Sequence, residues 1–240
     1  MFNRVLPDWP VEPPRVRWGL REAFICLVVA QFGALLWATA VVVVSGESTT
    51  RSRPIAFLVV SNLALWLAYF LGPLIVSRRL GQGPRIDFDI GIDLGEAAVA
   101  ASAGVILQLA VLPLAYWPIT RVVDADPGRA AQDLVDRVNS PFDVVLLAVA
   151  VVLIAPVVEE LFYRGMLLPA VTSATGVVVG IVGSALIFAL VHQDLILVPG
   201  LTLFGVLVGW LTATTGRIGP AIVAHMAFNA TTVIKLLTEI

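Results

Sequence analysis

Charged residues are scarce in this chain. Asp, Glu, Lys and Arg make up 13% of its 240 residues and hydrophobic residues 59%, whereas about 25% charged residues is usual for soluble domains. The formal net charge is only -2, and no run of Lys and Arg interleaved with aromatic residues offers a phosphate-binding face. These shortages exclude an ordinary soluble domain and argue against a nucleic-acid partner.

Cysteine and lysine are nearly absent. The one cysteine, Cys26, lies in the first apolar run, so the chain can form no intrachain disulfide bond and no cysteine-rich metal site. We expect it to be a buried, inert thiol. Lys235 is the one lysine beside fourteen arginines. Together with abundant Ala, Val and Gly, this bias is typical of a GC-rich coding sequence and points to a bacterial source.

The chain has long apolar runs instead. A helix needs about 20 apolar residues to cross ~30 Å of hydrocarbon, and seven stretches come near that length: 23–44, 54–76, 94–116, 142–168, 175–193, 199–215 and 218–237. Turn and breaker residues separate them, for example at Pro199-Gly200. The sequence therefore predicts an all-α fold, a polytopic transmembrane helical bundle of about seven (six to eight) spans.

The N-terminal segment, residues 1–22, is rich in Pro and Arg. The apolar run that follows is too long for the core of a signal peptide, so we expect a retained first span. When this segment is placed in the cytoplasm, the short inside loops carry more Lys and Arg than the outside loops, by a narrow margin. The sequence therefore predicts a multi-pass protein of the plasma membrane with a cytoplasmic N-terminus.

Charge is placed where the bilayer makes it costly. Glu159 and Glu160 follow the apolar run from Val144 to Val158, and Arg164 lies four residues further. A charged residue at the middle of a span costs about 2.5–3.5 kcal/mol on insertion scales, so such residues pair inside the bundle or do chemistry. Glu160 and Arg164 share a helix face and can pair, whereas Glu159 is rotated by one position and remains available. A buried ionic staple between helices is the structural alternative.

The two histidines of the chain also lie in or at the edge of apolar runs. His192 follows Phe188 by four residues, and His225 precedes Asn229 by four. A single His or Asn in a membrane helix usually makes a hydrogen bond between helices. The coincidence of both histidines with the charged cluster favours a common site.

Spacing supports that site. Glu159 lies seventeen residues before Gly176 and His192 sixteen residues after it, so a hairpin that turns at Gly176 would place the two at the same depth. His225 and Asn229 share one face of the last span, and the four side chains can line one polar cavity. However, His225 lies only ~9 Å of helix beyond its turn, against ~24 Å for Glu159. The hairpin at Gly176 should therefore protrude, or the helices should tilt strongly.

Three motifs thus occur in order and in separate spans. They are Glu159-Glu160 with Arg164, Phe188 with His192, and His225 with Asn229. This ordered set resembles the CPBP family (CAAX protease / bacteriocin-processing, ABI) of intramembrane peptidases, over about residues 142 to 235. The resemblance implies a catalytic helical core at 142–237, with accessory transmembrane helices and loops at 23–141.

The resemblance also implies an intramembrane endopeptidase that hydrolyses peptide bonds of membrane-associated or lipidated substrates. Its catalytic set would be Glu159, Glu160, Arg164, His192, His225 and Asn229. Glu159 is the candidate general base for a water molecule, which His192 would hold. His225 and Asn229 would donate N–H groups to the carbonyl oxygen, while Glu160 and Arg164 would fix the helix face.

A metal-dependent mechanism would use some of the same residues. Glu159, His192 and His225 make a three-ligand set with a fourth position open for water, as in a catalytic zinc site. The helix motif His-Glu-x-x-His is absent. The cofactor is therefore either one zinc ion or none, and we favour the metal-free mechanism because Asn229 suits an oxyanion donor better than a zinc ligand.

Two other functions fit part of the pattern. Ionisable residues within spans can form a proton relay in a transporter, but secondary transporters usually have two related halves, and all three motifs here lie in the second half. A non-catalytic immunity or scaffold protein would keep the fold without turnover, although every expected catalytic residue is present. The sequence favours an enzyme whose partners are the lipid bilayer and a membrane-associated peptide or protein substrate.

Overall fold

The computed structural model describes residues 17–46, 54–124 and 126–238, and these residues form helices and loops without a strand. Within them, six helical segments are long and apolar enough to cross a membrane: Leu20–Ser45, Ile55–Leu80, Leu94–Ile119, Pro141–Thr175, Val198–Thr215 and Gly219–Thr238. Val177–Leu190 is a shorter apolar helix. The prediction of a polytopic helical bundle is therefore confirmed, and the chain is a multi-pass membrane protein. Most of the predicted cytoplasmic segment 1–22 lies outside the described residues.

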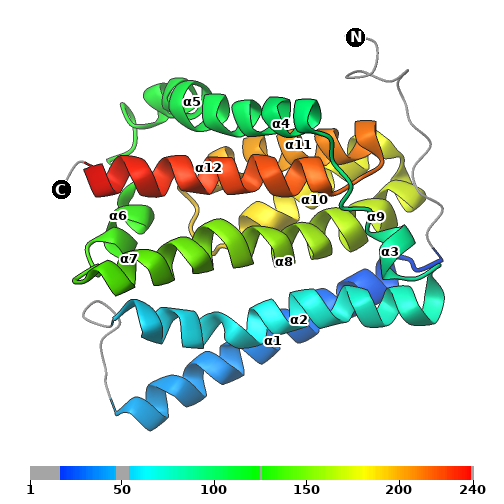
Figure 1. Ribbon diagram of the computed structural model, residues 1–240, viewed down its shortest axis with the longest axis horizontal. Helices are drawn as coiled ribbons and strands as arrows, with labels where there is room; N and C mark the ends of the chain where they lie inside the picture. The colour runs from blue at the N-terminus through cyan, green and yellow to red at the C-terminus, as the bar shows by residue number, and fades with distance from the viewer. Residues whose placement is uncertain (1–16, 47–53, 125, 239–240) are drawn as a thin grey trace.

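The long helices run side by side across the molecule (Figure 1). Helices α1 (Leu20–Ser45) and α2 (Ile55–Leu80) pack on each other as a hairpin, and α2 also packs on α8 (Ala155–Phe162). Helix α12 (Gly219–Thr238) contacts α8 on one side and α4 (Leu94–Ile106) on another. Helix α10 (Val177–Leu190) packs against α11 (Val198–Thr215), and α11 contacts α12. The remaining short helices are α3 (Pro84–Asp87), α5 (Leu112–Ile119), α6 (Arg129–Val135), α7 (Pro141–Leu147) and α9 (Leu168–Thr175).

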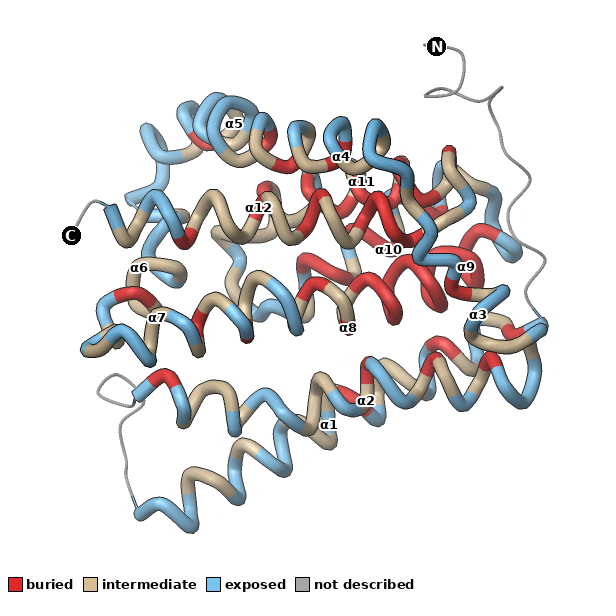
Figure 2. Tube along the Cα trace, viewed as in Figure 1, coloured by how far each residue is buried: buried red, intermediate tan, exposed pale blue. Residues whose placement is uncertain are grey.

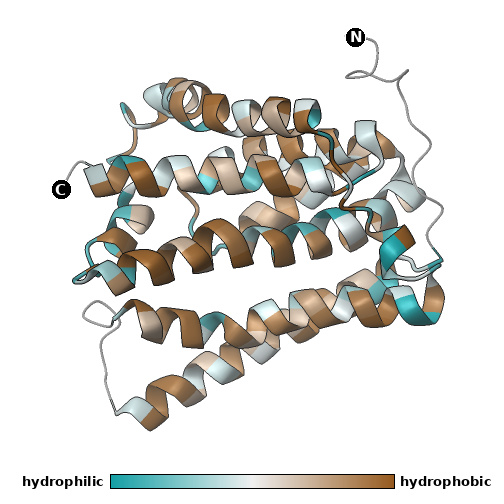
Figure 3. Cartoon of the chain, in the orientation of Figure 1, coloured by the Kyte–Doolittle hydropathy of each residue, from teal (hydrophilic) through white to brown (hydrophobic). Residues whose placement is uncertain are grey.

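Burial is concentrated in the second half of the chain. Every residue from 160 to 172 is buried, and Figure 2 shows buried stretches gathered in α8 to α11 while the outer helices are largely exposed. The exposed side chains of α1 are apolar, among them Leu36 at 70% and Val44 at 87%. Figure 3 shows hydrophobic colour along most helices. Apolar residues that face outward are expected where hydrocarbon rather than water surrounds the bundle.

In the part of the chain that the structure describes, three π-helical segments interrupt the spans: η2 (Leu107–Val111), η3 (Ala148–Ile154) and η4 (Tyr163–Leu167). Each is followed by an α-helix whose second residue is proline, namely Pro113, Pro156 and Pro169. In each case the residue before the proline donates its N–H to the carbonyl five residues back. Because η3 and η4 lie at either end of α8, the helix that carries the two glutamates is bounded by π segments, which occur often at functional sites.

Glycines let the helices around the site approach closely. A Cβ on Gly205 of α11 would lie 2.7 Å from the Cβ of Ala185 in α10. A Cβ on Gly104 of α4 would collide with the backbone carbonyl of Ala224 in α12. These two contacts leave no room for a larger side chain. They set the positions of α11 and α12 against their neighbours.

Candidate active site

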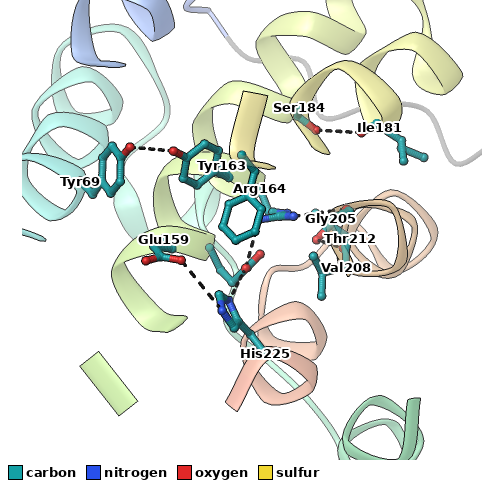
Figure 4. A network of polar contacts seen from close by, with 12 residues as sticks. Tyr69, Glu159, Tyr163, Arg164, Ile181, Ser184, Gly205, Val208, Thr212 and His225 are labelled. Carbon is teal, nitrogen blue, oxygen red and sulfur yellow. Dashed lines mark hydrogen bonds and ion pairs between the residues drawn. The ribbon is translucent and has the colours of Figure 1, made fainter. Parts of the chain in front are cut away.

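Glu160 lies at the centre of the polar cluster. Its side chain has no exposed surface, and its Oε1 accepts hydrogen bonds from Nη1 of Arg164 at 3.1 Å and from Nδ1 of His225 at 2.7 Å. The predicted pair between Glu160 and Arg164 is therefore present. The sequence did not predict that His225 shares the same oxygen. Figure 4 shows Arg164 and His225 turned toward each other, Arg164 from η4 and His225 from α12.

Arg164 connects this cluster to two more helices. Its Nη2 donates to the carbonyl oxygen of Gly205 in α11 at 3.2 Å, and its guanidinium carbon lies 4.9 Å from the centre of the Phe188 ring in α10. The Arg164 side chain is also fully buried. A planar guanidinium can bond a carboxylate and a carbonyl at once while it stacks on a ring, so Arg164 fixes both its charge partner and the packing around it.

Glu159 faces the other side of the His225 ring. Its Oε2 lies 3.9 Å from Nε2 of His225, and its side chain is 16% exposed, in contrast to the enclosed Glu160. The carboxylate of Glu160 accepts a hydrogen bond from the Nδ1–H group of His225. In a neutral His225 ring, Nε2 would therefore carry no proton. Donation from Nε2 requires the imidazolium, which has a carboxylate on each side. The site therefore places one accessible carboxylate beside a histidine that the buried pair holds in position.

His192 follows the end of α10 and is exposed. Its Nδ1 lies 2.8 Å from the carbonyl oxygen of Phe188. A carbonyl can only accept, so Nδ1 carries the proton and Nε2 of the neutral ring is free to accept. The Phe188 ring lies 4.8 Å from the His192 ring and 6.1 Å from the His225 ring, so both histidines adjoin one aromatic side chain. Among the described contacts, no hydrogen bond or ion pair joins His192 directly to Glu159, although the two lie close enough to interact electrostatically.

Asn229 lies one turn after His225 on α12. Its Nδ2 donates to the carbonyl oxygen of Val151, in η3, at 2.8 Å. One of its two amide hydrogens is therefore bonded to the backbone of the fourth span, Pro141–Thr175. The other remains for a further acceptor.

Three residues that the sequence did not single out extend the network. Gln31 of α1 donates from Nε2 to the hydroxyl of Tyr69 in α2 at 2.7 Å, and that hydroxyl lies 2.6 Å from the hydroxyl of Tyr163. Tyr163 follows Glu159 by four residues, a spacing that was visible in the sequence. Gln31 and Tyr69 lie in spans without a motif, so only the structure connects them to the site. The chain links the α1–α2 hairpin to the helix that carries the glutamates.

The residues proposed as zinc ligands do not assemble into a metal site. Within residues 17–46, 54–124 and 126–238, no three His, Cys, Asp or Glu side chains come close enough together to hold a metal ion. Glu159 and His225 are neighbours, and His192 is bonded to the Phe188 carbonyl through Nδ1, which leaves Nε2 free. Glu159, His192 and His225 are thus not grouped closely enough, in the described residues, to serve together as three ligands of a tetrahedral metal ion.

Comparison with known proteins agrees with the motifs. Residues 141–231 match a family model described as type II CAAX prenyl endopeptidase Rce1-like. The matched stretch contains all six residues predicted for the catalytic set. No curated protein and no solved structure matches the chain. The match therefore agrees with the resemblance to CAAX-type peptidases that the motifs indicate.

Proposed function

We propose that this chain, in which residues 141–231 match the family model described as type II CAAX prenyl endopeptidase Rce1-like, hydrolyses peptide bonds by a metal-free, glutamate-based mechanism. The observation that carries the proposal is the position of Glu159. Its partly exposed carboxylate lies beside His225, which the buried pair of Glu160 and Arg164 holds from the opposite side.

In this mechanism Glu159 takes a proton from a water molecule as the water oxygen attacks the carbonyl carbon of the substrate. The carbonyl oxygen becomes an oxyanion, to which the imidazolium of His225 donates from Nε2. When the carbon–nitrogen bond breaks, the protonated Glu159 returns its proton to the leaving amine, so the enzyme ends as it began. Proton transfer of this kind contributes about 10²–10⁴-fold to the rate, and a preorganised oxyanion donor about 10²–10³-fold.

The other members of the predicted set support these steps. His192, whose Nε2 is free to accept, would hold the attacking water against Glu159. Asn229 has one amide hydrogen beyond the one given to Val151, and we assign it to the oxyanion. Glu160 balances the charge of Arg164 and orients His225, as the carboxylate of a catalytic triad orients its histidine.

We further propose that the substrate is a lipidated or membrane-associated peptide. The family description names prenyl endopeptidases, and Glu159, His225 and Asn229 lie within spans rather than in a loop. A peptide tethered to the bilayer reaches such a site without leaving the membrane. We place the N-terminus on the cytoplasmic side of a bacterial plasma membrane.

The test uses full-length protein in mild detergent or nanodiscs. The probes are quenched fluorescent peptides, with and without an S-prenylated cysteine four residues from the C-terminus. Glu159→Gln should lower kcat by about 10²–10⁴-fold, because the amide keeps the shape and loses the base. Glu22→Gln is the matched control, since Glu22 caps α1 at Gly19, has no contact with the site, and glutamine is also accepted at that capping position.

The outcomes separate the alternatives. Cleavage that E159Q abolishes while the melting temperature stays near that of the wild type supports the proposal. Retained cleavage in E159Q would overturn the general-base role. A wild-type protein that cleaves no probe in either form would favour the non-catalytic scaffold.

A further inference from the structure

The backbone carbonyl of Val151 has no partner within its own helix. The N–H of Ala155, four residues on, is given to the carbonyl of Ala150. Residue 156, five residues on, is Pro156 and has no N–H. Neither the α pattern nor the π pattern can therefore satisfy this carbonyl, and an unpaired carbonyl within a membrane span is unfavourable.

Asn229 supplies the missing donor. Its Nδ2 lies 2.8 Å from the Val151 oxygen and comes from α12, 78 positions away in sequence. The two other π segments have the same arrangement, with the carbonyls of Gln108 and Arg164 facing Pro113 and Pro169. Of the three carbonyls, Val151 is the one for which the described contacts include a side-chain donor. The bond is therefore specific to the segment that leads into Glu159.

Helix α12 thus holds the fourth span at two points. His225 bonds Glu160, and Asn229, one turn later, bonds Val151. The stretch between these two points contains Pro156 and Glu159. Because a proline preceded by a π segment is a place where a helix bends, the second contact determines how α8 continues and where Glu159 lies relative to His225.

We infer that Asn229 is a positioning residue: its amide replaces the N–H that Pro156 lacks, clamps η3 to α12 and sets the position of Glu159. This inference rests on the proposed function for its catalytic consequence, but the clamp itself does not depend on catalysis. It adds a role for Asn229 that is separate from oxyanion donation, since the two roles use different amide hydrogens.

A double-mutant cycle tests the clamp. Pro156→Ala returns a backbone N–H at the position where Asn229 now substitutes for it. The four proteins are the wild type, N229A, P156A and P156A/N229A, each measured for its melting temperature in detergent and for kcat and KM. P169A and P169A/N229A are the matched controls, because Pro169 stands in the same relation to η4 as Pro156 to η3, and the described contacts of Asn229 do not include η4.

Asn229→Ala alone should lower kcat by about 10²-fold or more, since a misplacement near 1 Å has effects of this size. In the P156A background the same change should lower kcat about tenfold less, with KM unchanged, and should lower the melting temperature less. The P169A background should give no such recovery.

Equal losses from N229A in the wild-type and P156A backgrounds would overturn the clamp. Recovery of the melting temperature without recovery of kcat would overturn the positioning role, and leave Asn229 as a structural donor. If the wild type cleaves no probe, the proposed function fails, while the melting temperatures of the four proteins still decide whether the amide replaces the missing N–H.

Discussion

Replacing Arg164 with methionine removes one member of a buried ion pair and keeps a side chain of similar length. The side chains of Arg164 and Glu160 both have 0% exposure, and their bonded atoms lie 3.1 Å apart. Removing one partner of such a pair costs about 3–5 kcal/mol, because the other charge stays buried without compensation. His225 still bonds Glu160 at 2.7 Å, which places the expected loss for R164M near the lower end of that range.

The free energy of unfolding would be measured by SDS titration of the protein in mixed micelles, for the wild type, R164M, E160Q and E160Q/R164M. Glutamine at 160 keeps an oxygen that accepts from Nδ1 of His225 but carries no charge. Because the stranded carboxylate causes most of the loss, the double variant should be more stable than R164M. The stability of R164K should lie between those of the wild type and R164M. A lysine keeps the charge but cannot bond Glu160 and the Gly205 carbonyl together. Wild-type stability in R164M, or a double variant no more stable than R164M, would refute this explanation.

Two further predictions concern metal and packing. Purified protein should contain far less than one zinc ion per chain by mass spectrometry, and cleavage should survive chelation. One zinc ion per chain, with activity lost on chelation and restored by zinc, would contradict the metal-free mechanism. Gly205→Ala should destabilise the protein by about 1–3 kcal/mol, because the added Cβ would lie 2.7 Å from the Ala185 Cβ. Gly183→Ala on α10 is the control, because the nearest atom to the added Cβ would be 3.7 Å away. This change should be neutral or stabilising by up to ~1 kcal/mol. A comparable loss of stability in both variants would show that the Gly205 contact is not special.

The spans could be predicted because the bilayer imposes a length and a hydropathy that the sequence displays directly. The pair of Glu160 and Arg164 could be predicted because it depends only on spacing within one helix. The contact of His225 with Glu160, rather than only with Glu159, depends on how two helices are rotated against each other. That rotation is set by close contacts such as Gly104 against the Ala224 carbonyl, which a single sequence does not reveal.

The π segments explain why spacing arithmetic loses accuracy beyond one helix. Each π segment inserts one extra residue into a helical turn. The helix face predicted for a later residue, counted at 3.6 residues per turn, is therefore wrong by about 100°. The partner of Asn229 lies inside such a segment, and no motif marks Val151. The segment Pro141–Thr175 has 35 residues, or ~52 Å at 1.5 Å per residue, against ~30 Å of hydrocarbon. This segment must therefore tilt or extend beyond the bilayer. The sequence led to the same expectation, because His225 lies much closer to its turn than Glu159 does.

The two adjacent glutamates divide the work of the site because successive helix residues are rotated by about 100°. Glu160 is turned into the bundle, where Arg164 and His225 share one of its oxygens. Glu159 is turned the other way, its side chain remains 16% exposed, and its Oε2 lies 3.9 Å from Nε2 of His225. A purely structural staple would account for Glu160 and Arg164, but it gives no reason for a second carboxylate kept accessible within a span, where charge is costly. The accessible carboxylate, set against a histidine that its neighbour holds, is the feature that favours chemistry over scaffolding.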